Sequence, residues 1–188
     1  ETNKEKMPLL PAKDVIEKVL KDLTQAKELL TAEKTLRLED SNRRFRFNYH
    51  AVNALLARVY CYVGDAPHAI ACAQDVIDHC GLLLSSSNQD DPILFSECLV
   101  ALNMYHMQET TSRLWADGDK FSTQYFIRQE RFDKYFEVSG TTREDMRTKS
   151  AAFYEHSSTK TAISRKYNTN SHEAVPLIRL PEMYFILC

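Results

Sequence analysis

The sequence predicts a mainly α-helical fold with irregular loops and a few short strands, and three stretches carry that prediction. Residues 11–30 have the apolar spacing of one long helix, residues 47–78 have that of two helices joined by a tight turn, and the chain ends in a short apolar stretch of helical character. Apolar residues that recur every three or four positions share one face of a helix, and that face must be buried. The helices are therefore expected to pack on one another.

The first helix is expected between Pro11 and Leu30, with charged residues filling the positions between its apolar ones. A charged connector follows and ends in Arg43, Arg44 and Arg46, shortly after acidic residues. Such a cluster can bind a phosphate or an acidic partner, but arginines beside carboxylates more often form ion pairs on a protein surface. We therefore predict an exposed patch of ion pairs in the connector.

Residues 47–78 predict an αα-hairpin. The first of its two helices has small residues at close spacing, namely Ala51, Ala54 and Ala57. Small side chains let a neighbouring backbone approach, so the helices should cross in tight contact. Gly64 can take the left-handed conformation that ends a helix, and Asp65 can cap the next helix by accepting from its free N–H groups. The expected result is an antiparallel helix pair with almost no connecting loop.

Residues 81–173 predict a loop-rich region with short strands. Periodicity cannot separate strand from helix in the apolar run 98–102, for which we favour a strand. An alternating stretch through Tyr154 favours another strand, and residues 160–172, rich in asparagine, serine and threonine, predict a surface loop or hairpin.

Trp115, the only tryptophan, is the candidate ligand-binding residue of this region. It lies in a polar stretch typical of an exposed loop, and its broad apolar face with a polar edge suits stacking on a sugar ring. The alternative, which is the commoner role of a large aromatic side chain, is that Trp115 only holds its loop against the core. Several other aromatic residues follow at roughly helical spacing and are expected in the core: Phe121, Tyr125, Phe126, Phe132, Tyr135 and Phe136.

Composition argues against several functional classes. The net charge of −2 comes from 24 basic and 26 acidic residues that are well mixed, so the chain lacks the basic field of a nucleic-acid-binding protein. None of the four glycines belongs to a phosphate-binding loop, and the six histidines show no metal-ligand spacing. No carboxylate pair lies in an apolar context that would raise the pKa of one member for acid catalysis. We therefore predict no nucleic-acid partner, cofactor, metal site, catalytic residue or enzymatic activity. The five cysteines, which lack CxxC spacing, are expected to be small buried residues.

Several separated segments, taken in order, resemble one protein family. The pattern DL..A..LL begins at Asp22, ALLARVYCYVGD covers residues 54–65, and VPLIRLPEMYFIL covers residues 175–187. This ordered set resembles the SusD/RagB family of outer-membrane nutrient-binding lipoproteins, and the last segment is its most specific part. Pro181 and Cys188 depart from the family pattern, which more often has alanine at those positions.

The resemblance implies a single SusD-like domain over residues 1–188, apparently a fragment of a longer protein. Tetratricopeptide-like hairpins of a SusD-like α-α superhelix would occupy residues 12–80, a loop-rich ligand or partner region residues 81–173, and the start of a further repeat helix residues 174–188. The implied function is non-catalytic capture of glycans or other nutrients at the extracellular face of the outer membrane. A lipid anchor absent from this chain would hold the protein there, and a SusC-like TonB-dependent transporter would receive the ligand.

The alternative function is that of a tetratricopeptide-like adaptor that binds another protein inside the cell. The helix pair alone permits this function equally well. The five cysteines, which lack the spacing of a disulfide framework, favour an intracellular location, although an anaerobic cell surface would also keep thiols reduced.

Overall fold

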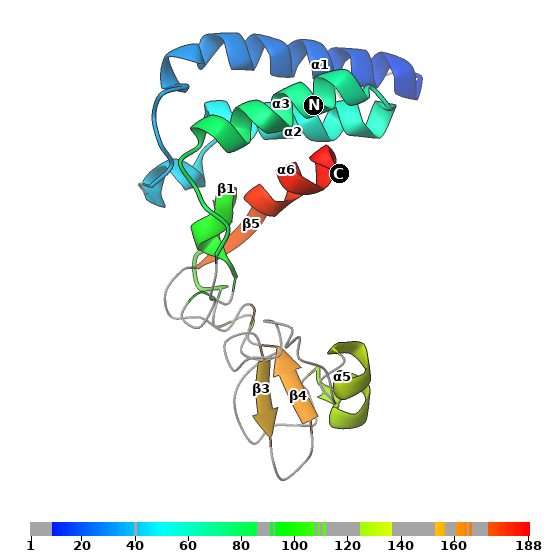
Figure 1. The fold of residues 1–188 in the computed structure, drawn as a ribbon, viewed down its shortest axis with the longest axis vertical. Coiled ribbons are helices and arrows are strands. Elements are labelled where there is room, and N and C mark those ends of the chain that lie inside the picture. The colour runs from blue at the N-terminus through cyan, green and yellow to red at the C-terminus, as the bar shows by residue number, and fades with distance from the viewer. Residues whose placement is uncertain are drawn as a thin grey trace, which may run out of the picture.

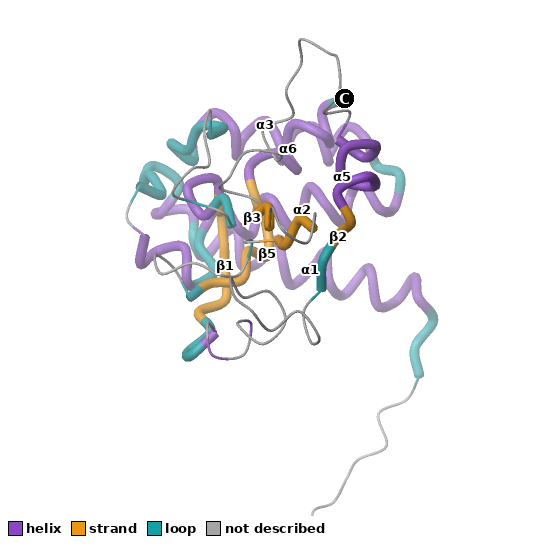
Figure 2. Tube along the Cα trace, turned by 90° about the horizontal axis from the view of Figure 1, so that it is seen from below, coloured by secondary structure: helices purple, strands orange, loops and turns teal. Residues whose placement is uncertain are grey.

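The computed structural model describes residues 9–39, 41–85, 91, 93–107, 109, 111, 125–136, 153–156, 161–164, 166 and 173–188. Within them the protein is mainly helical with a few short strands, as predicted. Figure 1 shows a layer formed by helices α1 (Ala12–Leu29), α2 (Tyr49–Val63) and α3 (Ala66–His79). A smaller group lies below it and contains α5 (Gln129–Phe136), β3 (Phe153–His156) and β4 (Thr161–Ser164). In the view from below in Figure 2, this smaller group lies in front of the helical layer.

The predicted αα-hairpin is confirmed by α2 and α3. Asn48 caps α2, with its side-chain oxygen accepting from the backbone N–H of Ala51 at 3.0 Å. Gly64 ends α2 with a φ of 80°, and the Asp65 side chain caps α3 by accepting from the backbone N–H of His68 at 3.3 Å. The three small residues of α2 that were expected at the helix contact are fully buried: Ala51, Ala54 and Ala57. The tight turn between the two helices thus follows from local sequence chemistry.

The main core lies where α1, α3 and the last helix, α6 (Leu180–Leu187), meet α2. Leu56, Val76 and Met183 are buried in it, and Leu20 and Leu23 of α1 pack against it from one side. On the other side, Arg58 of α2 forms a two-pronged ion pair with Glu182 of α6, at 2.5 and 2.7 Å. Helix α6 is therefore attached to the hairpin by both apolar contacts and charge.

The segment before α6 corrects the prediction of a helix over 174–188. Its first part is a strand, β5 (Ala174–Arg179), which pairs antiparallel with β1 (Cys98–Asn103). The predicted strand at 98–102 is confirmed by β1. Two prolines explain why residues 174–188 divide into a strand and a helix. Pro176 lies within β5 and is unsuited to a helix interior, whereas Pro181 lies in the first turn of α6, where proline is tolerated.

The arginine cluster of the connector is only partly the exposed patch that was predicted. Arg43 and Arg46 pair with Glu33 at 3.3 and 3.9 Å near the surface. Arg44, in contrast, is buried, and its guanidinium donates to the backbone carbonyls of Leu38 and Phe95, both at 2.7 Å. The surface prediction is wrong for Arg44 because its side chain donates to one carbonyl of the same connector and to one of a segment that is remote in the sequence.

The smaller group is a three-stranded antiparallel sheet, with strand β2 (Ile127–Arg128) beside β4 and β4 beside β3, and with α5 packed on it. The strand expected through Tyr154 is confirmed as β3. Of the loop or hairpin expected over 160–172, the described residues Thr161–Ser164 form strand β4 instead, which pairs with the preceding strand β3. The prediction that this stretch lies at the surface is wrong for Ala162 and Ile163, which are buried. The helix α5 was not predicted as such, although its aromatic residues were noted.

A cluster of aromatic rings joins α5 to the sheet. Phe132 is fully buried, and its ring lies 4.7 Å from that of Phe136 and 5.0 Å from that of Phe153. The core prediction is thus confirmed for Phe132. It is wrong for Tyr135, which is exposed because the two-turn helix α5 covers the sheet with one face only. It is also wrong for Tyr125 and Phe126, which precede β2 and are exposed. Phe121 lies outside the described residues.

The cysteines follow their prediction in three of five cases. Cys72, Cys80 and Cys98 are buried, whereas Cys61 and Cys188 are exposed, and all five are free thiols. Across the described ranges, none of the helices combines the length and the apolar character that crossing a membrane requires.

Candidate functional site

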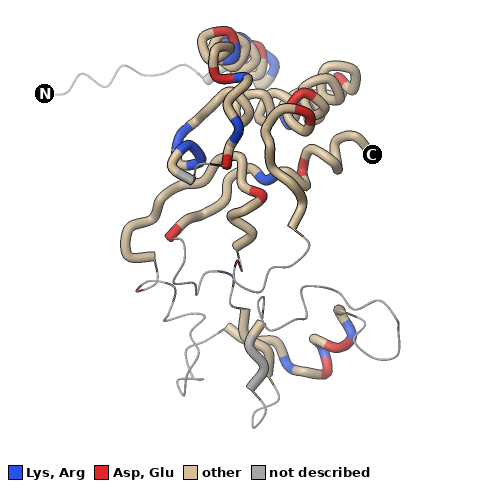
Figure 3. Tube along the Cα trace, turned by 60° about the vertical axis from the view of Figure 1, so that its left-hand side comes forward, with Lys and Arg blue, Asp and Glu red and all other residues tan. Residues whose placement is uncertain are grey.

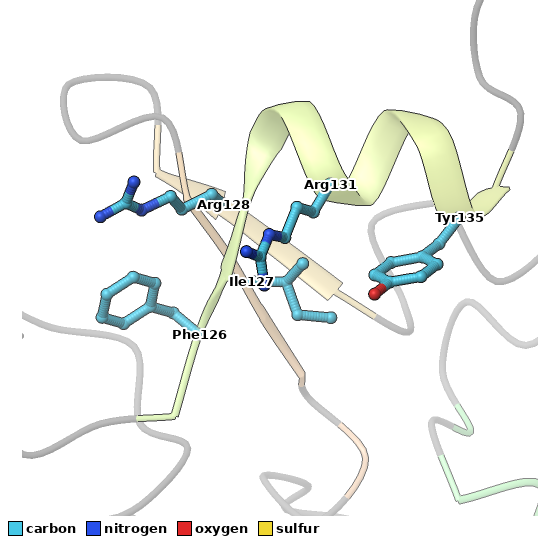
Figure 4. Close-up of a pocket in the computed structure, with 5 residues that line it drawn as sticks. All are labelled: Phe126, Ile127, Arg128, Arg131 and Tyr135. Atoms are coloured by element: carbon cyan, nitrogen blue, oxygen red, sulfur yellow. The ribbon is translucent and has the colours of Figure 1, made fainter.

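A pocket of about 450 Å³ lies beside α5 in the smaller group. Figure 4 shows the described residues that line it: Phe126, Ile127, Arg128, Arg131 and Tyr135. They come from β2, from the residue before it and from α5. The pocket therefore combines aromatic rings with two positive charges, and its volume lies within the range of small-molecule sites.

The local structure explains how these side chains come to line one pocket. Phe126 and Arg128 are two residues apart in an extended segment, so their side chains leave the backbone on the same side. Arg131 and Tyr135 are four residues apart on α5 and share one helix face, and in Figure 4 both project toward Ile127. Pairing of Ile127 with Ala162 holds this segment on the sheet.

The packing of Phe132 and Phe136 against the aromatic ring of Phe153 in the sheet decides which side chains reach the pocket. Phe132 directly follows Arg131, and Phe136 directly follows Tyr135. Successive residues of an α-helix are about 100° apart around the helix axis, so the two pairs face different sides. When the phenylalanine face is buried, the arginine and tyrosine are left at the solvent edge. Tyr135 is 69% exposed and Phe126 45% exposed.

The electrostatics of the pocket are unbalanced. Arg128 and Arg131 are both exposed, and in the part of the chain that the structure describes neither guanidinium has an ion pair or hydrogen bond. Figure 3 shows acidic and basic residues interspersed along the helices, so the imbalance is local. Aromatic faces beside unpaired guanidinium groups can stack on a ring and donate to its polar substituents.

The residues of this pocket were not predicted from the sequence. Aromatic enrichment around 125–136 was noted, but it was interpreted as core. The usable signal was the spacing of Arg128, Arg131 and Tyr135, which recur at i, i+3 and i+7 next to the apolar positions. Trp115, the residue that was chosen for stacking, lies outside the described residues.

A second cluster of polar side chains surrounds Asp75 on α3. Its carboxylate accepts from Asn53 at 2.6 Å and from the Tyr49 hydroxyl at 2.9 Å, and it pairs with Lys34 at 2.7 Å and with His79 at 3.3 Å. Both carboxylate oxygens are thus engaged by groups from the connector, α2 and α3. This cluster forms one wall of a groove of about 380 Å³ that α1 also lines. Because its partners are the protein's own, we interpret it as a structural cross-link.

The pKa values in this cluster are shifted by its contacts. Burial by itself raises the pKa of Asp75, but hydrogen bonds from Lys34 and Tyr49 and the nearby positive charges outweigh burial, so the pKa of Asp75 lies below its usual value. The pKa of Tyr49 rises to about 12 because burial and the Asp75 carboxylate both disfavour the phenolate.

The raised pKa of Tyr49 predicts a loss of stability in alkali. A group whose pKa is higher in the folded protein contributes stability that is complete below its unfolded pKa, about 10 for tyrosine, and that is lost as the pH rises toward 12. Urea unfolding measured from pH 9 to pH 12 should therefore show a falling midpoint. We expect a shallower fall in Tyr49→Phe, because phenylalanine does not titrate.

The matched control for Tyr49 is Tyr62→Phe, since Tyr62 is 81% exposed on the same helix. This variant should follow the wild-type curve. Parallel curves for wild type and Tyr49→Phe would contradict the assignment of the alkaline loss to Tyr49.

Among the described residues, no three histidine, cysteine, aspartate or glutamate side chains are grouped so that they could hold a metal ion. Comparison of the chain with protein-family models and with curated proteins found no match.

Proposed function

We propose that the protein is a SusD-like nutrient-binding protein that captures glycans, without catalysis, at the extracellular face of the bacterial outer membrane. In this proposal the full-length protein is held by a lipid anchor and delivers its ligand to a SusC-like TonB-dependent transporter. The residues that support the family assignment are ALLARVYCYVGD in α2 and the following turn, and VPLIRLPEMYFIL in β5 and α6.

The helical layer supports a scaffold role in this proposal. The α2–α3 hairpin buries three alanines of α2, α1 packs on one side of it and α6 on the other. We propose that these helices are tetratricopeptide-like units of a SusD-like superhelix, because such units are also short antiparallel helix pairs that bury a face against their neighbours.

The single observation that carries the binding proposal is the arginine and aromatic pocket. Sugar rings present apolar C–H faces that stack on aromatic side chains, and they present oxygens that accept from guanidinium groups. The exposed rings of Phe126 and Tyr135 and the guanidinium groups of Arg128 and Arg131 supply both kinds of contact. None of the described lining residues is a carboxylate, histidine or cysteine, which fits binding better than hydrolysis.

Replacing Tyr135 with alanine should weaken glycan binding about 3- to 10-fold, the worth of one aromatic contact. Calorimetric titration of the full-length protein with a panel of polysaccharides, oligosaccharides and peptides measures this loss. Tyr62→Ala is the matched control, because it removes an equally exposed tyrosine from α2, remote from the pocket. Equal affinities in wild type and Tyr135→Ala would contradict the site. Trp115→Ala, measured in parallel, tests whether Trp115 also stacks on the ligand.

The cellular part of the proposal is tested at the genetic locus. A reading frame that starts with a signal peptide and a lipidation cysteine, next to a TonB-dependent transporter gene, is the expected arrangement. A complete locus with neither feature would contradict the proposal and favour the intracellular adaptor.

A further inference from the structure

We propose that the pocket selects acidic oligosaccharides, whose sugar units carry a carboxylate or a sulfate ester. This inference rests on the proposed function and adds the chemical class of the ligand. The feature that carries it is the pair Arg128 and Arg131, two cations that lie beside the same cavity and have no acidic partner among the described residues.

The two arginines are placed to act together. They are three residues apart across the junction of β2 and α5, and both line the pocket. Figure 4 shows their side chains on either side of the strand end, with the guanidinium of Arg131 lying over Ile127. A guanidinium presents two parallel N–H groups that match the oxygens of a carboxylate, and it matches the oxygens of a sulfate in the same manner.

The acidic residues of α5 do not neutralise these charges. Asp133 accepts instead from the side-chain amide of Gln129 at 3.0 Å, and neither Asp133 nor Glu130 is among the described lining residues. Two like charges beside one cavity repel each other, and a bound anion removes that repulsion. An acidic ligand therefore gains more from this pocket than its neutral counterpart does.

The aromatic rings favour a saccharide over a small free anion. A phosphate or acetate ion would contact the guanidinium groups but would leave the rings of Phe126 and Tyr135 exposed to water. An oligosaccharide can place a ring against Tyr135 while its acidic group reaches Arg131, one helical turn away. The combination of ring and charge is what distinguishes an acidic sugar from a neutral one.

The test is calorimetric titration of the full-length protein with matched ligands. Oligogalacturonate is compared with its methyl ester, which keeps the same backbone without charge, and sulfated galactan oligosaccharides, which have no carboxylates, are compared with their neutral desulfated form. We expect at least one acidic ligand to bind about 10- to 100-fold more tightly than its neutral match, the worth of one charged hydrogen-bonded contact. The ester pair and the sulfate pair then identify which acidic group is selected.

The variant Arg128→Gln/Arg131→Gln should remove this preference, so that the acidic ligand and its neutral match bind with similar affinity. Arg128→Lys/Arg131→Lys keeps the charge but loses the paired N–H groups, so it should have an intermediate affinity. The control is Lys18→Gln/Lys21→Gln, which makes the same charge change on the exposed face of α1 and should retain wild-type affinity. Circular dichroism verifies that each variant is folded.

Three results would overturn the inference. Equal binding of acidic and neutral ligands is the first, and an equal loss in the α1 control, which would indicate general surface charge, is the second. Both leave the proposed function standing if Tyr135→Ala still weakens glycan binding. The third is that no saccharide binds at all while an acidic peptide or free acetate does, and this result overturns the proposed function as well.

Discussion

Replacing Phe132 with alanine is expected to destabilise the group formed by α5 and its three-stranded sheet by about 3–5 kcal/mol. The ring of Phe132 is fully buried and is within 5.0 Å of both Phe136 and Phe153, whose own rings lie 5.5 Å apart. Removing it leaves a cavity at the centre of this aromatic cluster. The sheet is small, so few other buried side chains are present to compensate.

Hydrogen exchange is the measurement that separates this local effect from a global one. Amides in 125–136 and 161–164 should lose protection in Phe132→Ala, while those of α2 and α3 keep theirs. Tyr135→Ala is the control, because it removes an exposed aromatic residue from the same short helix. Unchanged protection in 125–136, or an equal loss in α2 and α3, would show that this group is not held as described.

The same substitution connects stability to binding. Arg131 and Tyr135 reach the pocket only while the phenylalanine face of α5 is held against the sheet. Phe132→Ala should therefore weaken ligand binding although Phe132 is not among the residues that line the pocket. Binding in this variant should recover under conditions that restore protection of α5.

The helical hairpin was predictable because its signals are local. Gly64 and Asp65 specify the turn by their own backbone and capping chemistry, and the alanines of α2 mark the contact face without reference to any other segment. Residues 174–179 were harder to predict because their strand exists through pairing with β1, which is remote in the sequence. Their apolar character is equally compatible with a buried helix.

The pocket was less predictable than the fold. An aromatic residue in an amphipathic stretch is either core or surface according to which helix face a neighbouring sheet covers, and that sheet is assembled from β2, β3 and β4. The sequence pattern therefore located Phe132 correctly and misplaced Tyr135. The prediction for Trp115 rested on its chemistry alone, and it remains a prediction.

Arg44 illustrates the same limit, and it carries the second large effect. We expect Arg44→Met to destabilise the protein by about 2–4 kcal/mol. The guanidinium donates to the carbonyls of Leu38 and Phe95, and it lies 5.3 Å from the centre of the Phe95 ring. A hydrogen bond from a charged donor contributes about 1.5–3 kcal/mol, and relief of the buried charge in the methionine variant offsets part of the loss.

Urea unfolding at neutral pH measures the effect, with Arg46→Met as the matched control. Arg46 belongs to the same arginine cluster, but its side chain is 62% exposed and its ion pair with Glu33 is long, at 3.9 Å. Such an exposed pair contributes little, so replacing Arg46 should change stability by less than about 0.5 kcal/mol. Equal losses in the two variants would show that charge at the connector matters rather than the buried contacts. A loss confined to Arg44→Met would mean that one arginine of this cluster joins the connector to the segment that leads into β1, a role that depends on the Phe95 carbonyl, which is remote in the sequence.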